Sequence, residues 1–280
     1  VKLQHAPQLA SPAAAPTQDS EDIAIIGVSG RYPQAQNLSE FWHNLSQGID
    51  CIEEIPADRG WDLASLWQPG PVALGKSYAK WGGFLTDIDQ FDPLFFGISP
   101  AEAELMDPSE RLMLETVALA IEDAGYQPDR LAAASGDDEH PVGVYVGNMW
   151  GDYQLYGVDG DKPKTMVAPR SWYWAVANRI SYQFNFSGPS IVVDTACSSS
   201  LTALHLACEA LKRGEVAVAI AGGVNLTLHP QKYNSLCDLH FLSTDGRCRS
   251  FGEGGDGYVP AEGVGAVILK RKVDACRDGD

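Results

Sequence analysis

The sequence predicts an α/β domain with a largely parallel mixed sheet and helices on both faces. Five short runs are apolar and rich in β-branched residues, and helical segments lie between them; the runs are 23–28, 142–147, 190–194, 216–222 and 264–270. These runs do not alternate apolar with polar residues, which is typical of strands covered on both faces. Strands that alternate with helices indicate an α/β architecture.

The clearest helix between these strands covers 107–125. Asp107 is a good N-cap, the proline after it suits the first helical position, and Glu110 would complete a capping box. Gly125 can end the helix in a left-handed conformation. A shorter helix is expected over 39–48, where Gly48 would stop it.

Two segments fall outside this pattern. The first 20 residues are rich in Ala, Pro, Ser and Gln and show no sustained apolar period, so 1–20 is predicted to be a linker or an added tail. The ordered domain is expected over 21–280. Within it, segment 56–98 gathers Trp and Phe side chains among Pro, Gly and Asp. It could line an entrance to a site, but a second small core is the favoured interpretation.

The composition disfavours several classes of partner and location. The 280 residues include 20 Lys and Arg against 37 Asp and Glu, a net charge of −17, which argues against nucleic acid and anionic membranes. No apolar run reaches the roughly 18 residues of a membrane span, and no signal peptide is recognisable. The six cysteines show neither metal-site nor disulfide-scaffold spacing, so a cytoplasmic protein without a bound metal is expected.

One cysteine stands at a junction that suits covalent chemistry. The predicted strand 190–194 runs into Cys197, and a helix over 198–213 follows almost at once. Unpaired backbone N–H groups and the positive end of the helix dipole converge there, which lowers a thiol pKa and can stabilise the oxyanion of an attacked thioester. The alternative is a buried cysteine that only packs. The small neighbours of Cys197, an alanine and three serines, favour a nucleophile that forms an acyl-enzyme.

The helix over 198–213 is apolar on nearly every face. Such a helix is typically buried on all sides, and one sheet can cover only one of them. Another layer is therefore expected to cover the far face. Cys208 and His205, which lie on this helix, are interpreted as packed core residues.

The residues around Cys197 resemble the active-site signature of the β-ketoacyl synthases, specifically the ketosynthase domains of modular polyketide synthases. The signature is DTACSSS with ALHLA after it, within 194–207. The resemblance runs over about 23–272 and includes IAIIGVSGRYPQAQNLSEFWHNLSQG, FDPLFFGISPAEAELMDPSERLMLETVALAIEDAGY, ANRISYQFNFSGPS, AIAGGVNLTLHP and LSTDGRCRSFGEGGDGYVPAEGVGAVILKR. The YVP-x-EG form of the last motif is similar to synthases that receive extender units from a separate acyltransferase.

This resemblance implies a thiolase-like fold, an α-β-α-β-α layered architecture in which two similar halves share central helices. The family completes its active site with two histidines in the second half, the first in an H-G-T-G-T motif. None of the six histidines here stands in such a motif. Residues 21–280 are therefore expected to be the N-terminal, nucleophile-bearing half, which lacks its complementary C-terminal ketosynthase half and cannot condense alone.

The reaction that the resemblance implies is a decarboxylative Claisen condensation. Cys197 would accept an acyl chain from the phosphopantetheine arm of an acyl carrier protein, so no dissociable cofactor is expected. A malonyl unit on a second carrier protein would then lose carbon dioxide and attack the thioester. The alternative is a non-elongating gate or docking scaffold. A homodimer paired through strand 190–194 is also implied.

Three further motifs carry weaker interpretations. The Gly-rich segments GEGGDG (252–257) and AGGVN (221–225) lack the lysine of a phosphate-binding loop and are predicted to be tight turns near the pocket. The aromatic cluster 172–174 either shapes the choice of acyl chain or packs in the core.

Overall fold

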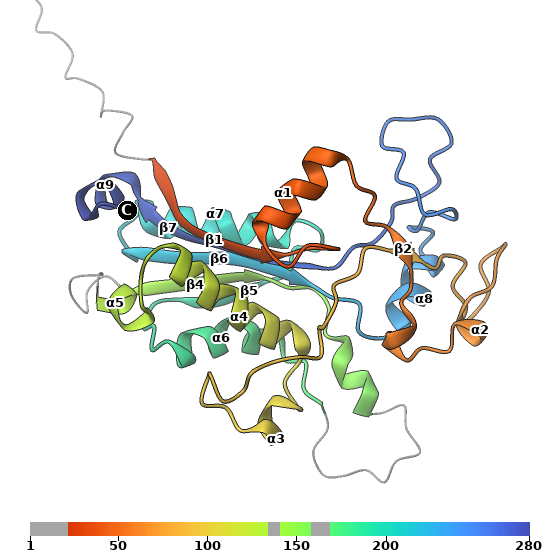
Figure 1. The fold of residues 1–280 in the computed structure, drawn as a ribbon, viewed down its shortest axis with the longest axis horizontal. Coiled ribbons are helices and arrows are strands. Elements are labelled where there is room, and N and C mark those ends of the chain that lie inside the picture. Colours follow the sequence, from red (N-terminus) through yellow and green to blue (C-terminus); the bar gives the residue numbers. More distant parts are fainter. Residues whose placement is uncertain (1–21, 134–140, 158–168) are drawn as a thin grey trace, which may run out of the picture.

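The computed structural model describes residues 22–133, 141–157 and 169–280; the predicted linker 1–20 lies outside them. At the centre of this described part is a five-stranded sheet in the order β1-β7-β6-β4-β5 (Figure 1). Its strands are β1 (Ile23–Arg31), β4 (Val142–Gly147), β5 (Ser190–Val193), β6 (Val218–Asn225) and β7 (Gly263–Arg271). The five expected strands are confirmed, with small shifts at their ends.

The sheet is mixed but mostly parallel, as predicted. β4 pairs in parallel with β5 and β6, while β7 is antiparallel to both β6 and β1. In this sheet, β7 alone therefore runs against the other four strands. Its first residue, Gly263, consequently pairs with Asn225, the last residue of β6. We call the end of the sheet where β4, β5 and β6 finish the carboxyl end.

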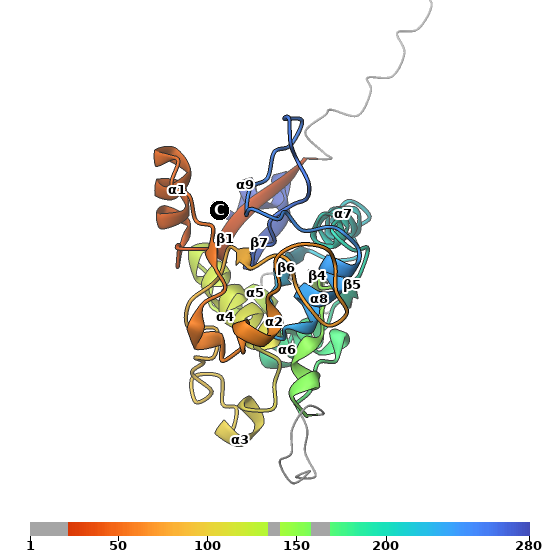
Figure 2. The same ribbon diagram turned by 90° about the vertical axis from the view of Figure 1, so that its right-hand side faces the viewer.

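Helices cover both faces of the sheet (Figure 2). Those of the described residues are α1 (Leu38–Gln47), η2 (Ala57–Arg59), α2 (Leu63–Leu66), α3 (Pro100–Ala103), α4 (Pro108–Asp123), α5 (Pro128–Ala133), η3 (Asp152–Gly157), α6 (Tyr173–Gln183), α7 (Ser199–Lys212), α8 (Gln231–Asp238) and α9 (Lys272–Asp278). α4 and α6 enclose the main core on one face, and α7 packs on the other. Among the described residues, no helix is both long and apolar enough to cross a bilayer.

The caps of α4 follow the sequence with one exception. Asp107 is the N-cap, and its carboxylate accepts a hydrogen bond from the Ser109 N–H at 2.8 Å. The carboxylate of Glu110 instead turns to Arg179 of α6, whose Nε donates to it at 2.8 Å. The expected capping box gives way to this contact because α6 packs beside the start of α4.

A smaller lobe lies beyond the carboxyl end of the sheet, at the right of Figure 1. It contains α2, α8 and a two-stranded sheet of β2 (Glu53–Glu54) and β3 (Trp81–Gly82). Tyr78 and Phe84 pack there against Tyr233 and Leu236 of α8. The excursion over 56–98 thus helps to build a second small core, as the favoured interpretation predicted.

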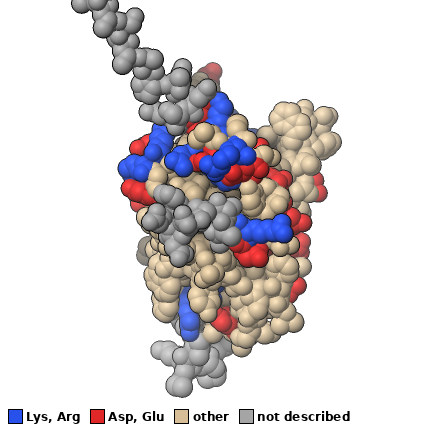
Figure 3. Space-filling model, turned by 90° about the vertical axis from the view of Figure 1, so that its left-hand side faces the viewer, with Lys and Arg blue, Asp and Glu red and all other residues tan. Residues whose placement is uncertain are grey.

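The opposite end of the molecule carries charges of both signs (Figure 3). The ammonium group of Lys270, whose side chain is 2% exposed, lies 2.8 Å from Asp278 and 2.6 Å from Asp280. Nearby, Arg277 pairs with Asp274 at 2.7 Å. Because these groups neutralise one another, the described residues of this face form ion pairs rather than a patch of one sign.

The outward face of α7 is open, and the layer that was expected to cover it is not among the described residues. Ala207 and Leu211 are buried against the sheet, whereas Leu201 is 70% exposed. His205 is exposed as well, so its interpretation as a packed core residue is wrong. Cys208 is half-buried and packs against the core. The reason is geometric, since among the described elements α7 packs chiefly on the strands beneath it.

Candidate active site

Cys197 lies on a sharp turn between β5 and α7, at the carboxyl end of the sheet. The residue before it, Ala196, has a φ of 55°, in the left-handed region that alanine rarely adopts. The Ala196 N–H donates to Asp194 Oδ1 at 3.0 Å. The Thr195 N–H donates to Ser199 Oγ at 2.9 Å. These two hydrogen bonds hold a strained turn that leaves the Cys197 side chain exposed.

Two glycines let the first turn of α7 sit directly on the sheet. A Cβ on Gly147, at the end of β4, would lie 2.5 Å from the Ser200 nitrogen. A Cβ on Gly223, in β6, would lie 2.8 Å from the Ser200 Cβ. Because no side chain fits at these distances, the glycines set how closely the start of α7 approaches the strands. The tight turn predicted over 221–225 is therefore wrong, since this segment is the last part of β6 and pairs with β7.

The other five cysteines occupy different environments. Cys237 is buried, and Cys51 and Cys208 are half-buried. Burial raises the pKa of both half-buried thiols, which makes them poorer nucleophiles. Cys248 and Cys276 are exposed, but neither stands between a strand and the first turn of a helix. Cys197 alone among the six combines exposure with that position.

A buried glutamate fixes the segment that leads into β7. Glu262, whose side chain is 1% exposed, accepts hydrogen bonds from the N–H groups of Leu85 at 2.9 Å and Thr227 at 2.8 Å. It also forms an ion pair with Arg59 at 2.6 Å. This single carboxylate joins the lobe, the chain after β6 and the start of β7.

Tyr258 lies at the same end of the sheet as Cys197 and was not predicted from the sequence as a site residue. It follows the Gly-rich segment 252–257, which is an irregular turn as predicted, with Gly254 at a φ of 74°. Burial raises the pKa of the Tyr258 phenol, and a thiolate on the neighbouring Cys197 raises it further. The YVP-x-EG motif contains this tyrosine, but its proximity to Cys197 depends on the folding of distant segments.

A buried lysine contacts the end of β6 and the segment that follows β4. Lys232 Nζ donates to Asn225 Oδ1 at 2.8 Å and to the Leu226 carbonyl at 2.6 Å, and it lies 4.9 Å from the centre of the Trp150 ring. Burial lowers the pKa of this lysine to about 8. Through Lys232, α8 is tied to the end of β6 and to the segment after β4.

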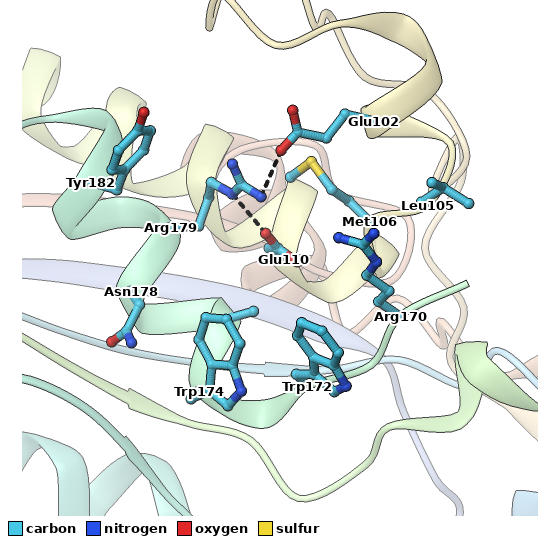
Figure 4. A pocket seen from close by; sticks show the side chains of 11 residues that line it. Glu102, Leu105, Met106, Glu110, Arg170, Trp172, Trp174, Asn178, Arg179 and Tyr182 are labelled. Carbon is cyan, nitrogen blue, oxygen red and sulfur yellow. Dashed lines mark hydrogen bonds and ion pairs between the residues drawn. The ribbon is translucent and has the colours of Figure 1, made fainter. Parts of the chain in front are cut away.

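The aromatic cluster 172–174 borders a separate pocket of about 350 Å³ (Figure 4). The Trp172 and Trp174 rings stack with their centres 5.3 Å apart, and both are more than half exposed. Arg179 lines the opposite wall, where it pairs with Glu110. Packing in the core is therefore wrong for both tryptophans. The lining residues come from 102–110 and 170–182, so this pocket does not include the Cys197 turn.

Comparison with protein families gives one match over most of the chain. Residues 20–275 match the model of the β-ketoacyl synthase N-terminal domain. The polyketide synthase PksL of Bacillus subtilis strain 168 is 54% identical over 264 residues, which are 94% of this chain and 6% of that protein. The polyketide synthase ThaG of Burkholderia thailandensis is 51% identical over 95% of this chain and 5% of its own length.

Two solved structures with a similar fold are ketosynthase domains. The oxazolomycin ketosynthase domain OzmH KS7 of Streptomyces albus JA3453 is 57% identical, with a TM-score of 0.86 over 92% of this chain and 45% of that domain. The ketosynthase from module 6 of the bacillaene synthase of Bacillus subtilis 168 is 44% identical, with a TM-score of 0.78 over 91% of this chain and 41% of its own. The chain therefore spans less than half the length of these solved ketosynthases.

Proposed function

Because the chain belongs to the β-ketoacyl synthase family, among the ketosynthases of polyketide synthases, we propose that Cys197 accepts an acyl chain for condensation with a malonyl-type extender. The observation that carries this proposal is the position of Cys197, exposed on a strained turn directly before α7. The positive end of the α7 dipole favours an oxyanion there, on the carbonyl group that Cys197 attacks.

The first step of the proposed reaction is a thioester exchange. The Cys197 thiolate attacks the carbonyl carbon of an acyl group on the phosphopantetheine arm of an acyl carrier protein. A carbon–sulfur bond forms to Cys197, the bond to the phosphopantetheine sulfur breaks, and that sulfur leaves as a thiolate that takes a proton. The carrier protein brings the thiol arm, so the proposal includes no dissociable cofactor.

The second step forms the new carbon–carbon bond. A malonyl unit on a carrier protein loses carbon dioxide, and the enolate carbon that remains attacks the acyl carbonyl on Cys197. The carbon–sulfur bond breaks and Cys197 returns as a thiolate. If the protein is a gate that passes acyl chains on without elongation, only the first step occurs.

We propose that a complementary ketosynthase half covers the open face of α7 and supplies groups that handle the malonyl unit. Leu201 on α7 supports this because it is apolar and 70% exposed. Covering such surface stabilises by about 25 cal/mol per Å². This chain by itself should bind a hydrophobic dye, and co-expression with a ketosynthase C-terminal half should abolish the signal. The proposal would be contradicted if this chain bound neither the dye nor a ketosynthase C-terminal half.

A homodimer through β5 is a further part of the proposal. β5 is an outer strand of the sheet, and its Ile191 is 42% exposed. Its unpaired edge can pair with the same edge of a second copy about a two-fold axis. Sedimentation of the intact protein should give twice the monomer mass, and Ile191→Lys should shift it towards the monomer. A wild-type monomer at micromolar concentration would contradict the pairing.

The nucleophile is tested by brief labelling of the intact protein with limiting iodoacetamide, followed by peptide mass spectrometry. Cys197 should react faster than the other five cysteines, and Cys197→Ser should take up no acyl group from an acyl N-acetylcysteamine thioester. Cys248 and Cys276 are matched controls because both are also exposed. Preferential labelling of either control, or normal acylation of Cys197→Ser, would overturn the assignment.

Elongation and gating are separated by supplying malonyl-loaded carrier protein to the acylated protein. Carbon dioxide release with a β-ketoacyl product supports condensation. Acylation of Cys197 without that product supports the gate.

A further inference from the structure

The chain just before β7 brings a tyrosine to the carboxyl end of the sheet. Because β7 is antiparallel, its first residue Gly263 pairs with Asn225 at the end of β6. β6 in turn lies against the first turn of α7, which follows Cys197. Tyr258, shortly before Gly263, therefore lies at the same end of the sheet as Cys197. The charge of a thiolate on Cys197 raises the pKa of its phenol.

The backbone of Tyr258 is held in place by its neighbours. Its N–H donates to the Phe241 carbonyl, and its own carbonyl accepts from the Ser243 N–H, both at 2.9 Å. The preceding Gly257 is packed so closely that a Cβ there would lie 2.3 Å from the Leu242 carbonyl carbon. These contacts fix the position of the Tyr258 backbone before any ligand binds.

The hydroxyl of Tyr258 is available to a ligand. The ring is 6.5 Å from that of Phe241, and 42% of the residue is exposed. Within the described part of the chain this hydroxyl has no hydrogen-bond partner, whereas those of Tyr156 and Tyr233 each donate to a backbone carbonyl. A tyrosine phenol, with an ordinary pKa of about 10, is neutral at physiological pH and can donate its proton in a hydrogen bond.

We propose that the Tyr258 hydroxyl donates a hydrogen bond to an oxygen on the acyl chain carried by Cys197, near the thioester, and so favours oxygenated acyl chains over fully reduced ones. This inference rests on the proposed acylation of Cys197. A site that provides a hydrogen-bond partner discriminates against an analogue that lacks the matching group. For one hydrogen bond between neutral groups, the preference should be about three- to tenfold.

The test compares two probes on the intact protein, the N-acetylcysteamine thioesters of 3-hydroxybutyrate and of butyrate. Acylation rates are followed by mass spectrometry of the whole protein. The wild type should prefer the 3-hydroxybutyryl probe, and Tyr258→Phe, which removes only the hydroxyl, should lower that preference by about three- to tenfold. Tyr182→Phe is the matched control, because Tyr182 is 81% exposed in the last turn of α6, before β5 begins. It should keep the wild-type preference.

The outcomes distinguish this inference from the proposed function. If neither probe acylates the wild type, both are overturned. If both probes acylate Cys197 and Tyr258→Phe keeps the wild-type preference, the role of Tyr258 is refuted while Cys197 remains the acceptor. If Tyr258→Phe slows both probes by the same factor, the hydroxyl acts on the thioester itself, and selection by the acyl oxygen is refuted.

Discussion

Replacement of Gly147 by alanine is expected to displace Cys197, although the atoms nearest to the new Cβ belong to Ser199 and Ser200. The new Cβ would lie 2.5 Å from the Ser200 nitrogen, where ordinary contacts begin at 3.4 Å. The first turn of α7 would therefore have to move by roughly 1 Å, and overpacking of this kind costs about 1–3 kcal/mol of stability. A misplacement of about 1 Å can cost ~100-fold in rate. Acylation of Cys197 in the folded variant should fall by roughly 10- to 100-fold.

The assay separates displacement from unfolding. Urea denaturation measures the free energy of unfolding, and acylation by a thioester probe is measured under conditions where each variant is folded. Gly143→Ala is the matched control on the same strand, since its Cβ would meet side-chain atoms of Tyr145 at 2.8 Å and Val216 at 3.1 Å. This control should lose stability and keep the wild-type rate. A folded Gly147→Ala protein that reacts at the wild-type rate would refute the close seating of α7 on β4.

Three further changes test the supports of the site. Glu262→Gln should lower the free energy of unfolding in urea by about 3–5 kcal/mol, because the buried Arg59 charge loses its partner; an unchanged midpoint would show that the ion pair adds nothing. Burial lowers the pKa of Lys232 from 10.5 to about 8. Between these two pH values the unfolded chain binds more protons than the folded chain, so the free energy of unfolding rises with pH by about 3 kcal/mol. Lys232→Met should lack that rise when the two proteins are denatured across this pH range, and a parallel rise in both would exclude Lys232 as its source. Ala196→Val should react more slowly at Cys197 than Ala196→Gly in thioester acylation, because a β-branched residue resists a φ of 55°; equal rates would mean that the strained turn is unimportant.

The sequence by itself was sufficient for features that depend on neighbouring residues. The apolar runs became strands, Asp107 became the cap of α4, and Cys197 stands between a strand and a helix as predicted. Strand formation, capping and turn geometry arise within a few residues, so a local pattern contains the information. The motifs around Cys197 also indicated the family, because many of them occur in order along the chain.

Several predictions that depended on packing partners failed. His205 is exposed because burial of a helix face is decided by the layer opposite it. Glu110 pairs with Arg179 because α6 lies beside α4, and no local pattern specifies that neighbour. Segment 221–225 is a strand because β7 is there to pair with it.

Only the tertiary structure placed Tyr258 at the same end of the sheet as Cys197 and joined three segments through Glu262. The order of the strands and the reversed direction of β7 bring these distant residues to one end of the sheet. A hydrophobic period or a turn signal records which face a residue prefers, but it does not record which other segment will lie against that face.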